Sequence, residues 1–301
     1  MQSEVLYRKY RPASFKDVLG QEHIVTVLEG SIREGNIAHA YLFSGSRGTG
    51  KTSMARILAK NLEVTDKDLY EIDAASNRGI DDIRELRDAV SVLPFDSPYK
   101  VYIIDEVHML TKEAFNALLK TLEEPPKHAL FILATTEIEK LPETIISRCQ
   151  TFTFKKPSQN ILADMVVKVA KKEGYELMAD AAELIALLSE GSFRDAHGVL
   201  QKIIFSTAKK KIEIADVERV TDAPRGVVVN NFIDAVARGD LEKALKAMRK
   251  IENDGTDMKV FAKLVLHKTR FILLLRYARE LENTIKEDFS SEDVAFMRDM
   301  S

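Results

Sequence analysis

The sequence predicts an α/β protein whose first part is a five-stranded parallel sheet and whose remainder is helical. Short apolar runs alternate with helical patterns over the first half of the chain, and near-continuous apolar strands of this kind indicate a parallel sheet covered by helices on both faces. The strand signal ends at Pro157, and only helical periodicity follows. With a second break near Pro224, we expect three domains, at residues 1–156, 157–222 and 223–301.

The elements follow from apolar spacing and from end signals. The strands are expected at residues 40–44, 69–73, 100–105, 129–134 and 151–154. Helices are expected between them at residues 51–62, 79–92 and 112–124. The third of these helices starts after Thr111, a candidate N-cap, and stops at Pro125. Further helices are expected at residues 179–188, 194–205, 226–237, 240–252, 257–281 and 290–300.

Composition indicates an ordinary globular protein. The 301 residues fit two or three domains, with 45% apolar residues, 30% charged residues and a net charge of -3. Global charge therefore does not indicate a nucleic-acid binder, and any DNA contact must come from a local basic surface or an assembly. With Cys149 alone, the chain can form neither an intrachain disulfide nor a thiolate zinc site. No signal peptide or membrane span is apparent, and we expect a soluble cytoplasmic protein.

A phosphate-binding loop is predicted between the first strand and the next helix. Residues Gly45 to Thr52 match G-x-x-x-x-G-K-[ST] in full. Backbone N–H groups of such a loop surround phosphate oxygens, and the helix N-terminus adds partial positive charge. Lys51 would reach the β- and γ-phosphates, and the Thr52 hydroxyl would hold Mg²⁺. The expected nucleotide contacts are Gly45, Ser46, Arg47, Gly48, Thr49, Gly50, Lys51, Thr52 and Ser53.

Two adjacent carboxylates end the third strand. Asp105 falls at the carboxyl edge of the parallel sheet, where ligands bind, and can hold Mg²⁺ through water. Glu106 can position or deprotonate the water that attacks the nucleotide. Two solvated carboxylates at a strand end are the alternative, and the nearby phosphate loop argues against it.

Three further polar residues are candidates on weaker grounds. Thr136 ends the fourth strand and could touch the γ-phosphate or the water, although threonine is also a normal strand residue. Arg148 is either a surface charge or an arginine finger that acts on a neighbour's ATP. Arg194 opens a helix, and a salt bridge at the helix start is an equally good interpretation of it.

Motifs along the first two expected domains resemble the gamma/tau subunits of bacterial DNA polymerase III clamp loaders, a family of AAA+ ATPases. The similarity is dense over residues 1–200 and looser beyond. The motifs that carry it are Arg8–Pro12, Asp17–Gln21, Gly45–Thr52, Asp73–Asp81, Val101–Leu110, Phe115–Pro126, Leu133–Thr136, Ile146–Gln150 and Gly191–Ala196.

The resemblance implies an AAA+ P-loop domain, a helical lid domain and a helical collar domain, the last of them truncated in this chain. It implies an adenine pocket lined by Tyr7, Arg8, Arg11, Pro12 and Val18. Thr136 would be the first sensor, and Arg194 would be the second, reaching the nucleotide from the lid. Arg148 would act in trans on the adjacent subunit's site.

The implied function is that of the ATP-hydrolysing motor subunit within the DNA polymerase III holoenzyme. ATP binding would open a sliding clamp, and hydrolysis would release the closed clamp on primer–template DNA. The implied partners are the other loader subunits in a five-membered ring, the clamp and the DNA. The helix after Arg78 and the helix near Lys112 would border the DNA channel.

One feature usual in the family, a zinc-binding module, has no counterpart in this sequence. Members usually carry a four-cysteine zinc module after the phosphate-loop helix, where this chain has only Glu63–Asp68 and no cysteine. The expected cofactors are therefore ATP and Mg²⁺, without zinc.

Other classes of protein share parts of this pattern. A branch-migration helicase motor would share the phosphate loop, but a winged DNA-binding domain should follow its lid, and no strand signal for one is present. A non-hydrolysing structural loader subunit would be expected to have lost part of the loop. A small-molecule kinase would need an acceptor pocket, which the long helical tail does not suggest.

Overall fold

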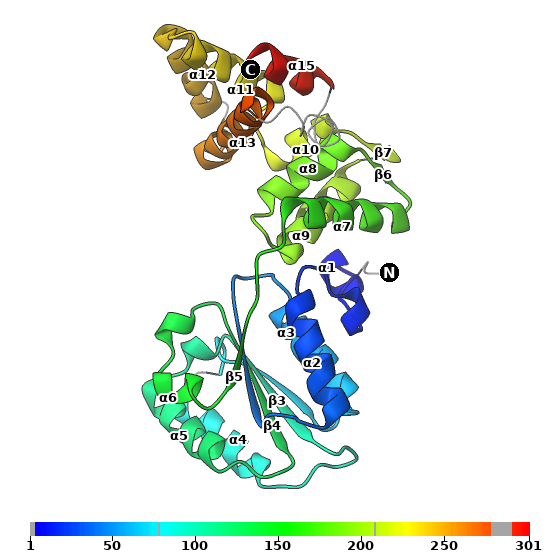
Figure 1. Ribbon diagram of the computed structural model, residues 1–301, viewed down its shortest axis with the longest axis vertical. Coiled ribbons are helices and arrows are strands. Elements are labelled where there is room, and N and C mark those ends of the chain that lie inside the picture. The colour runs from blue at the N-terminus through cyan, green and yellow to red at the C-terminus, as the bar shows by residue number, and fades with distance from the viewer. Residues whose placement is uncertain (1–3, 78, 208, 254, 278–290) are drawn as a thin grey trace. The chain divides into compact units, whose positions relative to one another are not determined.

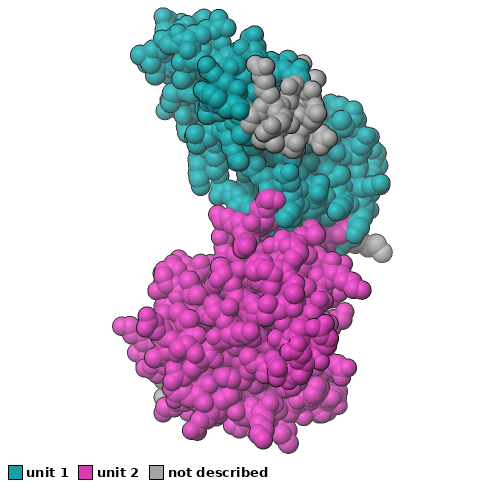
Figure 2. All heavy atoms as spheres, in the orientation of Figure 1, with its two compact units in different colours: residues 1–9, 159–301 teal, residues 10–158 magenta. Residues whose placement is uncertain are grey.

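The computed structural model describes residues 4–301 apart from 78, 208, 254 and 278–290 (Figure 1). It contains two compact units (Figure 2). Residues 10–158 form the sheet unit, and residues 1–9 with 159–301 form the helical unit. The predicted division into three domains stays a prediction.

The sheet unit contains the predicted five-stranded parallel sheet. Its order is β2-β3-β4-β1-β5, so the first strand lies inside the sheet. The strands are β1 (Ala40–Ser44), β2 (Leu69–Asp73), β3 (Lys100–Asp105), β4 (Ala129–Thr135) and β5 (Gln150–Thr153). The prediction is confirmed for all five, with β4 one residue longer and β5 one residue earlier than expected.

Side chains of the central strands alternate between two cores. From β1, Leu42 points to the core beneath α4 (Ile80–Val90) and α5 (Lys112–Glu123), while Phe43 points to the core beneath α2 (Glu22–Glu34) and α3 (Lys51–Asn61). Both faces of the sheet are therefore covered, as its apolar strands require. Helix α2 was not predicted. The predicted cap of α5 is confirmed, since the Thr111 hydroxyl accepts a bond from the Ala114 N–H at 3.2 Å.

Strand register brings the polar strand ends together. In the register of β1 and β4, Ser44 lies opposite Thr135, and in that of β3 and β4, Ile104 lies opposite Leu133. The segments that leave β1, β3 and β4 therefore start at one edge of the sheet. Short helices η2 (Val107–Met109) and η3 (Ile138–Lys140) follow β3 and β4 there. Two other short helices of this unit are η1 (Phe15–Asp17), before α2, and α6 (Glu143–Ile146), before β5.

The helical unit is built almost entirely from helices. They are α1 (Leu6–Lys9), α7 (Gln159–Lys172), α8 (Ala179–Leu188), α9 (Phe193–Ser206), α10 (Ile214–Thr221), α11 (Gly226–Ala237), α12 (Leu241–Asn253), α13 (Met258–Tyr277) and α15 (Ser291–Asp299). The expected absence of strands is wrong in one detail: β6 (Glu176–Leu177) and β7 (Lys211–Ile212) pair in parallel. The predicted end of α13, at residues 278–281, lies outside the described residues.

The N-terminal helix α1 packs on α9. The Leu6 N–H donates a bond of 3.0 Å to Gln201 Oε1, and Lys9 forms an ion pair with Glu173 at 2.6 Å. The first described residues therefore belong to the helical unit although they precede the sheet in sequence. None of the helices described in either unit is long and apolar enough to cross a bilayer.

Candidate nucleotide-binding site

The predicted phosphate loop follows β1 and leads into α3. Its first residue, Gly45, has φ +142°, and a Cβ there would lie 2.6 Å from the Phe154 carbonyl oxygen. Gly45 N–H donates to the Thr135 carbonyl oxygen at 3.2 Å, so the loop begins against the end of β4. Only glycine fits this position, which explains why the motif starts with it.

Lys51 lies inside the curve of the loop. Its side chain is buried, and its Nζ donates to the carbonyl oxygens of Gly45 at 2.7 Å and Ser46 at 3.0 Å. Burial lowers the pKa of Lys51, while the charges of Glu106 and Asp105 oppose this shift. The described bonds of this ammonium group go to neutral oxygens, so an anionic phosphate would be a stronger partner than those it has.

The predicted Mg²⁺ residues meet directly. Thr52 Oγ1 donates to Asp105 Oδ2 at 2.7 Å, which joins the first turn of α3 to the end of β3. The other oxygen, Asp105 Oδ1, accepts from the backbone N–H of Glu106 at 3.0 Å. A hydroxyl and a carboxylate are the hard oxygen donors that Mg²⁺ prefers, so this pair fits the ion.

Glu106 and Thr136 are also brought together. Thr136 donates to Glu106 Oε2 from its hydroxyl at 2.9 Å and from its backbone N–H at 3.3 Å. Glu106 has φ +50° and ψ +44°, a left-handed conformation that is uncommon for a residue other than glycine. Such backbone strain is concentrated at functional sites, where surrounding contacts maintain it.

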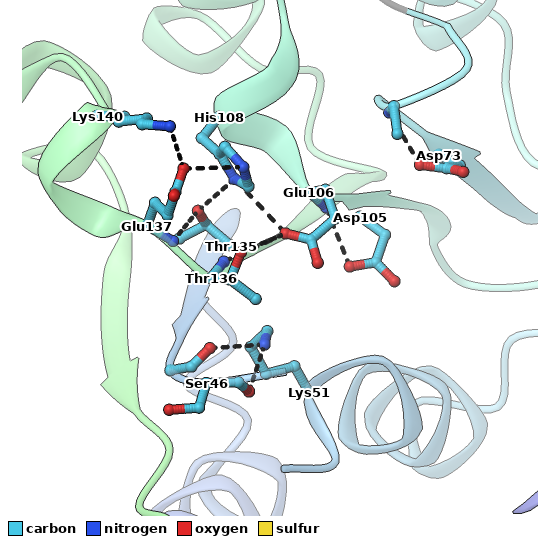
Figure 3. A network of polar contacts seen from close by, with 12 residues as sticks. Ser46, Lys51, Asp73, Asp105, Glu106, His108, Thr135, Thr136, Glu137 and Lys140 are labelled. Carbon is cyan, nitrogen blue, oxygen red and sulfur yellow. Dashed lines mark hydrogen bonds and ion pairs between the residues drawn. The ribbon is translucent and has the colours of Figure 1, made fainter. Parts of the chain in front are cut away.

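Three neighbours of Glu106 were not predicted as site residues. His108, Glu137 and Lys140 continue the network that starts at Glu106 (Figure 3). His108 lies within a motif that carried the family resemblance, two residues after Glu106, and that proximity was the available signal. Glu137 and Lys140 give no sequence signal beyond their spacing of three residues.

The predicted arginine finger is anchored away from the loop. Arg148 donates to the Thr144 carbonyl oxygen at 2.7 Å and to Glu123 Oε1 at 2.6 Å. Its side chain is 32% exposed. No described bond joins Arg148 to residues 45–52, so its role in trans stays a prediction.

The remaining predicted nucleotide contacts are divided between the two units. Tyr7, Arg8 and Arg194 belong to the helical unit, and Arg11, Pro12 and Val18 belong to the sheet unit. Within the helical unit, the Arg194 guanidinium stacks over the Tyr7 ring at 4.8 Å and the Arg8 guanidinium lies 5.8 Å from the same ring. The sequence did not predict this stack.

The predicted nucleotide contacts in the sheet unit differ in their exposure to solvent. Val18 packs against the core beneath α2 and α3, while Arg11 and Pro12 are half-buried. In the phosphate loop, Arg47 is exposed and Ser53 is half-buried. Their contacts with a nucleotide stay predictions.

Comparison with solved structures identifies the class of fold. The Thermotoga maritima RuvB Holliday junction branch migration motor superposes with a TM-score of 0.61 at 22% identity, over 75% of this chain and 79% of that chain. A point variant of the same RuvB protein also gives 0.61, at 21% identity and with the same coverage. The fold is that of the AAA+ ATPases, and at this identity the likeness extends to the fold alone.

Sequence comparison identifies the family within that class. A family model described as DNA polymerase III, delta subunit, matches residues 20–71 and 63–158. DNA polymerase III subunit tau of Bacillus subtilis is 41% identical over 95% of this chain and 54% of its own length. DNA polymerase III subunit gamma of Buchnera aphidicola is 40% identical over 82% of this chain and 71% of its own length. The chain belongs to the family of DNA polymerase III gamma/tau subunits, and it spans about half the length of the tau relative.

Proposed function

We propose that this chain is the ATP-hydrolysing motor subunit of a replicative clamp loader. One observation carries the proposal: Lys51, the Thr52–Asp105 pair and the Glu106–Thr136 pair lie at one edge of a parallel sheet, in a gamma/tau family member. The proposal goes beyond the relatives' names, which give the polymerase subunit and not its reaction.

The geometry supports a specific division of roles. Lys51 would bind the β- and γ-phosphates in place of its present carbonyl partners. Thr52 and Asp105 would hold Mg²⁺, which supplies neutralising charge to phosphate oxygens when bound. Both described bonds from Thr136 go to Glu106 Oε2. We therefore expect Oε1 of Glu106 to accept the proton of the attacking water, while Thr136 holds the other oxygen.

The rest of the family's machinery enters as part of the proposal. Arg194 would contact the nucleotide from a lid at residues 157–222, and Arg148 would complete the neighbouring subunit's site. A collar at residues 223–301 would hold a five-membered ring, in which ATP binding opens the sliding clamp on primer–template DNA. The family similarity supports these roles, and the absence of a zinc module between residues 63 and 68 stays a prediction.

ATP turnover by the assembled loader tests this function. We expect turnover to rise when both clamp and primed DNA are added, Lys51→Ala to lose ATP binding, and Glu106→Gln to bind ATP without turning it over. Turnover that ignores clamp and DNA would contradict the loader function. Normal ATP binding by Lys51→Ala would contradict the phosphate-loop assignment.

Mixed assemblies test the trans role separately. A ring that contains Arg148→Ala subunits beside intact ones should lose turnover at the neighbouring sites, because the finger serves the adjacent ATP. Full turnover in such a ring would contradict the assignment of Arg148.

A branch-migration motor is the second candidate, because a motor of that kind has this fold. The same assay separates the two, since stimulation by four-way junction DNA in the absence of a clamp would favour the motor. A non-hydrolysing structural subunit is less well supported, because Glu106 lies beside the metal-site residue Asp105.

A further inference from the structure

A buried histidine lies beside the catalytic glutamate. The side chain of His108 is 7% exposed and is held in η2, two residues after Glu106. Its Nδ1 lies 2.9 Å from Thr135 Oγ1 and 3.5 Å from Glu106 Oε2, and its Nε2 lies 3.4 Å from Glu137 Oε2 (Figure 3). One ring therefore contacts residues that follow two different strands, β3 and β4.

The partners of the ring define its hydrogen bonding. The Glu137 carboxylate only accepts, so Nε2 must carry a proton to bond with it. Thr135 Oγ1 already accepts from the Glu137 backbone N–H at 3.0 Å. In the neutral ring, the Thr135 hydroxyl can then donate to Nδ1, and the ring is fixed from both sides.

Glu137, which faces Nε2 of the ring, is held by contacts of its own. Glu137 forms an ion pair with Lys140, three residues later in η3. Because the Glu137 N–H also bonds to Thr135, the carboxylate that faces Nε2 is held by backbone and side chain together. Glu137 is 38% exposed and Lys140 is 58% exposed, so the backbone bond to Thr135 rather than the surface ion pair is the main support of Glu137.

The orientation of the Glu106 carboxylate depends on the residues around it. Its backbone is in the left-handed region, and its carboxylate Oε2 lies between Thr136 and His108. The neutral ring accepts from Thr135 at Nδ1 and therefore does not donate to Oε2, which lies 3.5 Å away; His108 acts on that oxygen through Thr135, the residue before Thr136. The described hydrogen bonds to this carboxylate come from Thr136, so loss of the ring would remove the support of the segment that makes them.

We propose that His108 is a positioning residue that, through Thr135, holds Thr136 against Glu106 Oε2 and so directs Oε1 toward the attacking water. The inference rests on the proposed function, in which Glu106 activates that water. His108 does not touch the reacting atoms; it acts on catalysis through the orientation of Glu106. A misplacement of about 1 Å is enough to lower the rate of the chemical step about 100-fold.

Three substitutions at His108 separate positioning from packing. Asparagine places its amide near the position of Nδ1, and glutamine places its amide near that of Nε2, whereas alanine removes both. We expect His108→Ala to lower kcat for ATP in the assembled loader about 10- to 100-fold with KM nearly unchanged. His108→Asn should keep most of kcat, because it retains the side facing Thr135 and Glu106, and His108→Gln should resemble His108→Ala.

A measurement without nucleotide gives a second readout. If His108 and Glu106 are coupled, the shift in the urea midpoint of the double variant His108→Ala with Glu106→Gln should differ from the sum of the two single shifts. His128→Ala is the matched control, since His128 is a half-buried histidine of the same unit whose Nε2 lies 3.0 Å from the Val90 carbonyl oxygen. It should shift the midpoint but leave kcat unchanged.

Different outcomes would overturn the positioning role of His108 and the catalytic role of Glu106. Full turnover by Glu106→Gln would overturn the catalytic role of Glu106 itself. An inactive Glu106→Gln with wild-type kcat in His108→Ala would overturn only the positioning role. Equal losses in all three His108 variants, with additive midpoint shifts, would also overturn it. If His108→Ala fails to fold, the contrast between His108→Asn and His108→Gln decides the question.

Discussion

Thr52 Oγ1 donates a 2.7 Å hydrogen bond to Asp105 Oδ2, and this contact aligns two hard oxygen donors before any ion binds. Thr52 lies in the first turn of α3, and Asp105 is the last residue of β3. This hydrogen bond therefore connects the phosphate loop to β3, the strand that Glu106 directly follows. In the proposed role, this pair would need little rearrangement to bind Mg²⁺, since its two oxygen donors are already oriented toward each other.

The first prediction concerns this pair. Asp105→Asn should raise the Mg²⁺ concentration needed for half-maximal ATP turnover about 10- to 100-fold, because a charged oxygen donor is lost. Thr52→Ser is the matched control, since it keeps the hydroxyl and should keep the Mg²⁺ dependence close to that of the parent chain. Turnover by Asp105→Asn with an unchanged Mg²⁺ dependence would remove this carboxylate from the metal site. Removal of Mg²⁺ with a chelator should stop turnover in every variant.

A second prediction concerns the start of the phosphate loop. Gly45→Ala should lower the free energy of unfolding by about 1–3 kcal/mol. The added Cβ would lie 2.6 Å from the Phe154 carbonyl oxygen, and the backbone φ at this position is +142°. Gly30→Ala in α2 is the control: a Cβ there meets nothing within 4 Å, and alanine favours a helix by about 1 kcal/mol. The urea midpoint should therefore fall for Gly45→Ala and rise for Gly30→Ala. Equal stability of Gly45→Ala and the parent chain would show that the loop can relax.

The sequence was sufficient to predict which strand ends meet at one edge of the sheet. Apolar runs defined β1, β3 and β4, and parallel strands bring their carboxyl ends to one edge. The meeting of Thr52 with Asp105 and of Glu106 with Thr136 follows from that rule. These contacts depend on topology, and topology is encoded in the alternation of strands and helices.

Other features depend on local geometry that periodicity does not encode. The ring of His108 contacts Thr135 and Glu137 from η2, which follows Glu106, a residue in a left-handed conformation. The stack of Tyr7 on Arg194 joins segments that lie far apart in sequence. Strands β6 and β7 have two residues each, too few to produce an alternating pattern.

A third prediction concerns pH and the loop after α4. Asp68 is buried, and its carboxylate accepts the backbone N–H groups of Phe95 at 2.6 Å, Asp96 at 2.9 Å and Ser97 at 3.0 Å. Burial alone would raise the pKa of Asp68, but these bonds lower it to about 2. Because the folded pKa lies below the unfolded value, the carboxylate stabilises the fold above about pH 4. That stabilisation should be lost as the pH falls from about 4 toward 2.

The Asp68→Asn variant checks this interpretation. Its amide cannot accept all three N–H groups, so the free energy of unfolding at neutral pH should fall by about 1–3 kcal/mol. The difference between the variant and the parent chain should shrink between pH 4 and pH 2, as the parent's carboxyl group becomes protonated. Asp66→Asn, a change at a neighbouring exposed position, should produce neither effect. A pH-independent difference would indicate that Asp68 acts through packing rather than through charge.

The fourth prediction concerns Tyr7 and rests on the proposed role of Arg194. The Arg194 guanidinium lies over the Tyr7 ring, 4.8 Å from its centroid, and it has more N–H donors than the Tyr7 hydroxyl can accept, so we expect the ring to orient Arg194 rather than withhold it. A cation–π contact of this kind contributes about 0.5–1 kcal/mol, which corresponds to about a 2- to 5-fold change in affinity. Tyr7→Leu should weaken binding of a non-hydrolysable ATP analogue by that factor, whereas Tyr7→Phe, which keeps the ring, should not. In an Arg194→Ala background, Tyr7→Leu should have no further effect, because the cation that it orients is gone. Tighter binding by Tyr7→Leu would show instead that the ring competes with the nucleotide for Arg194.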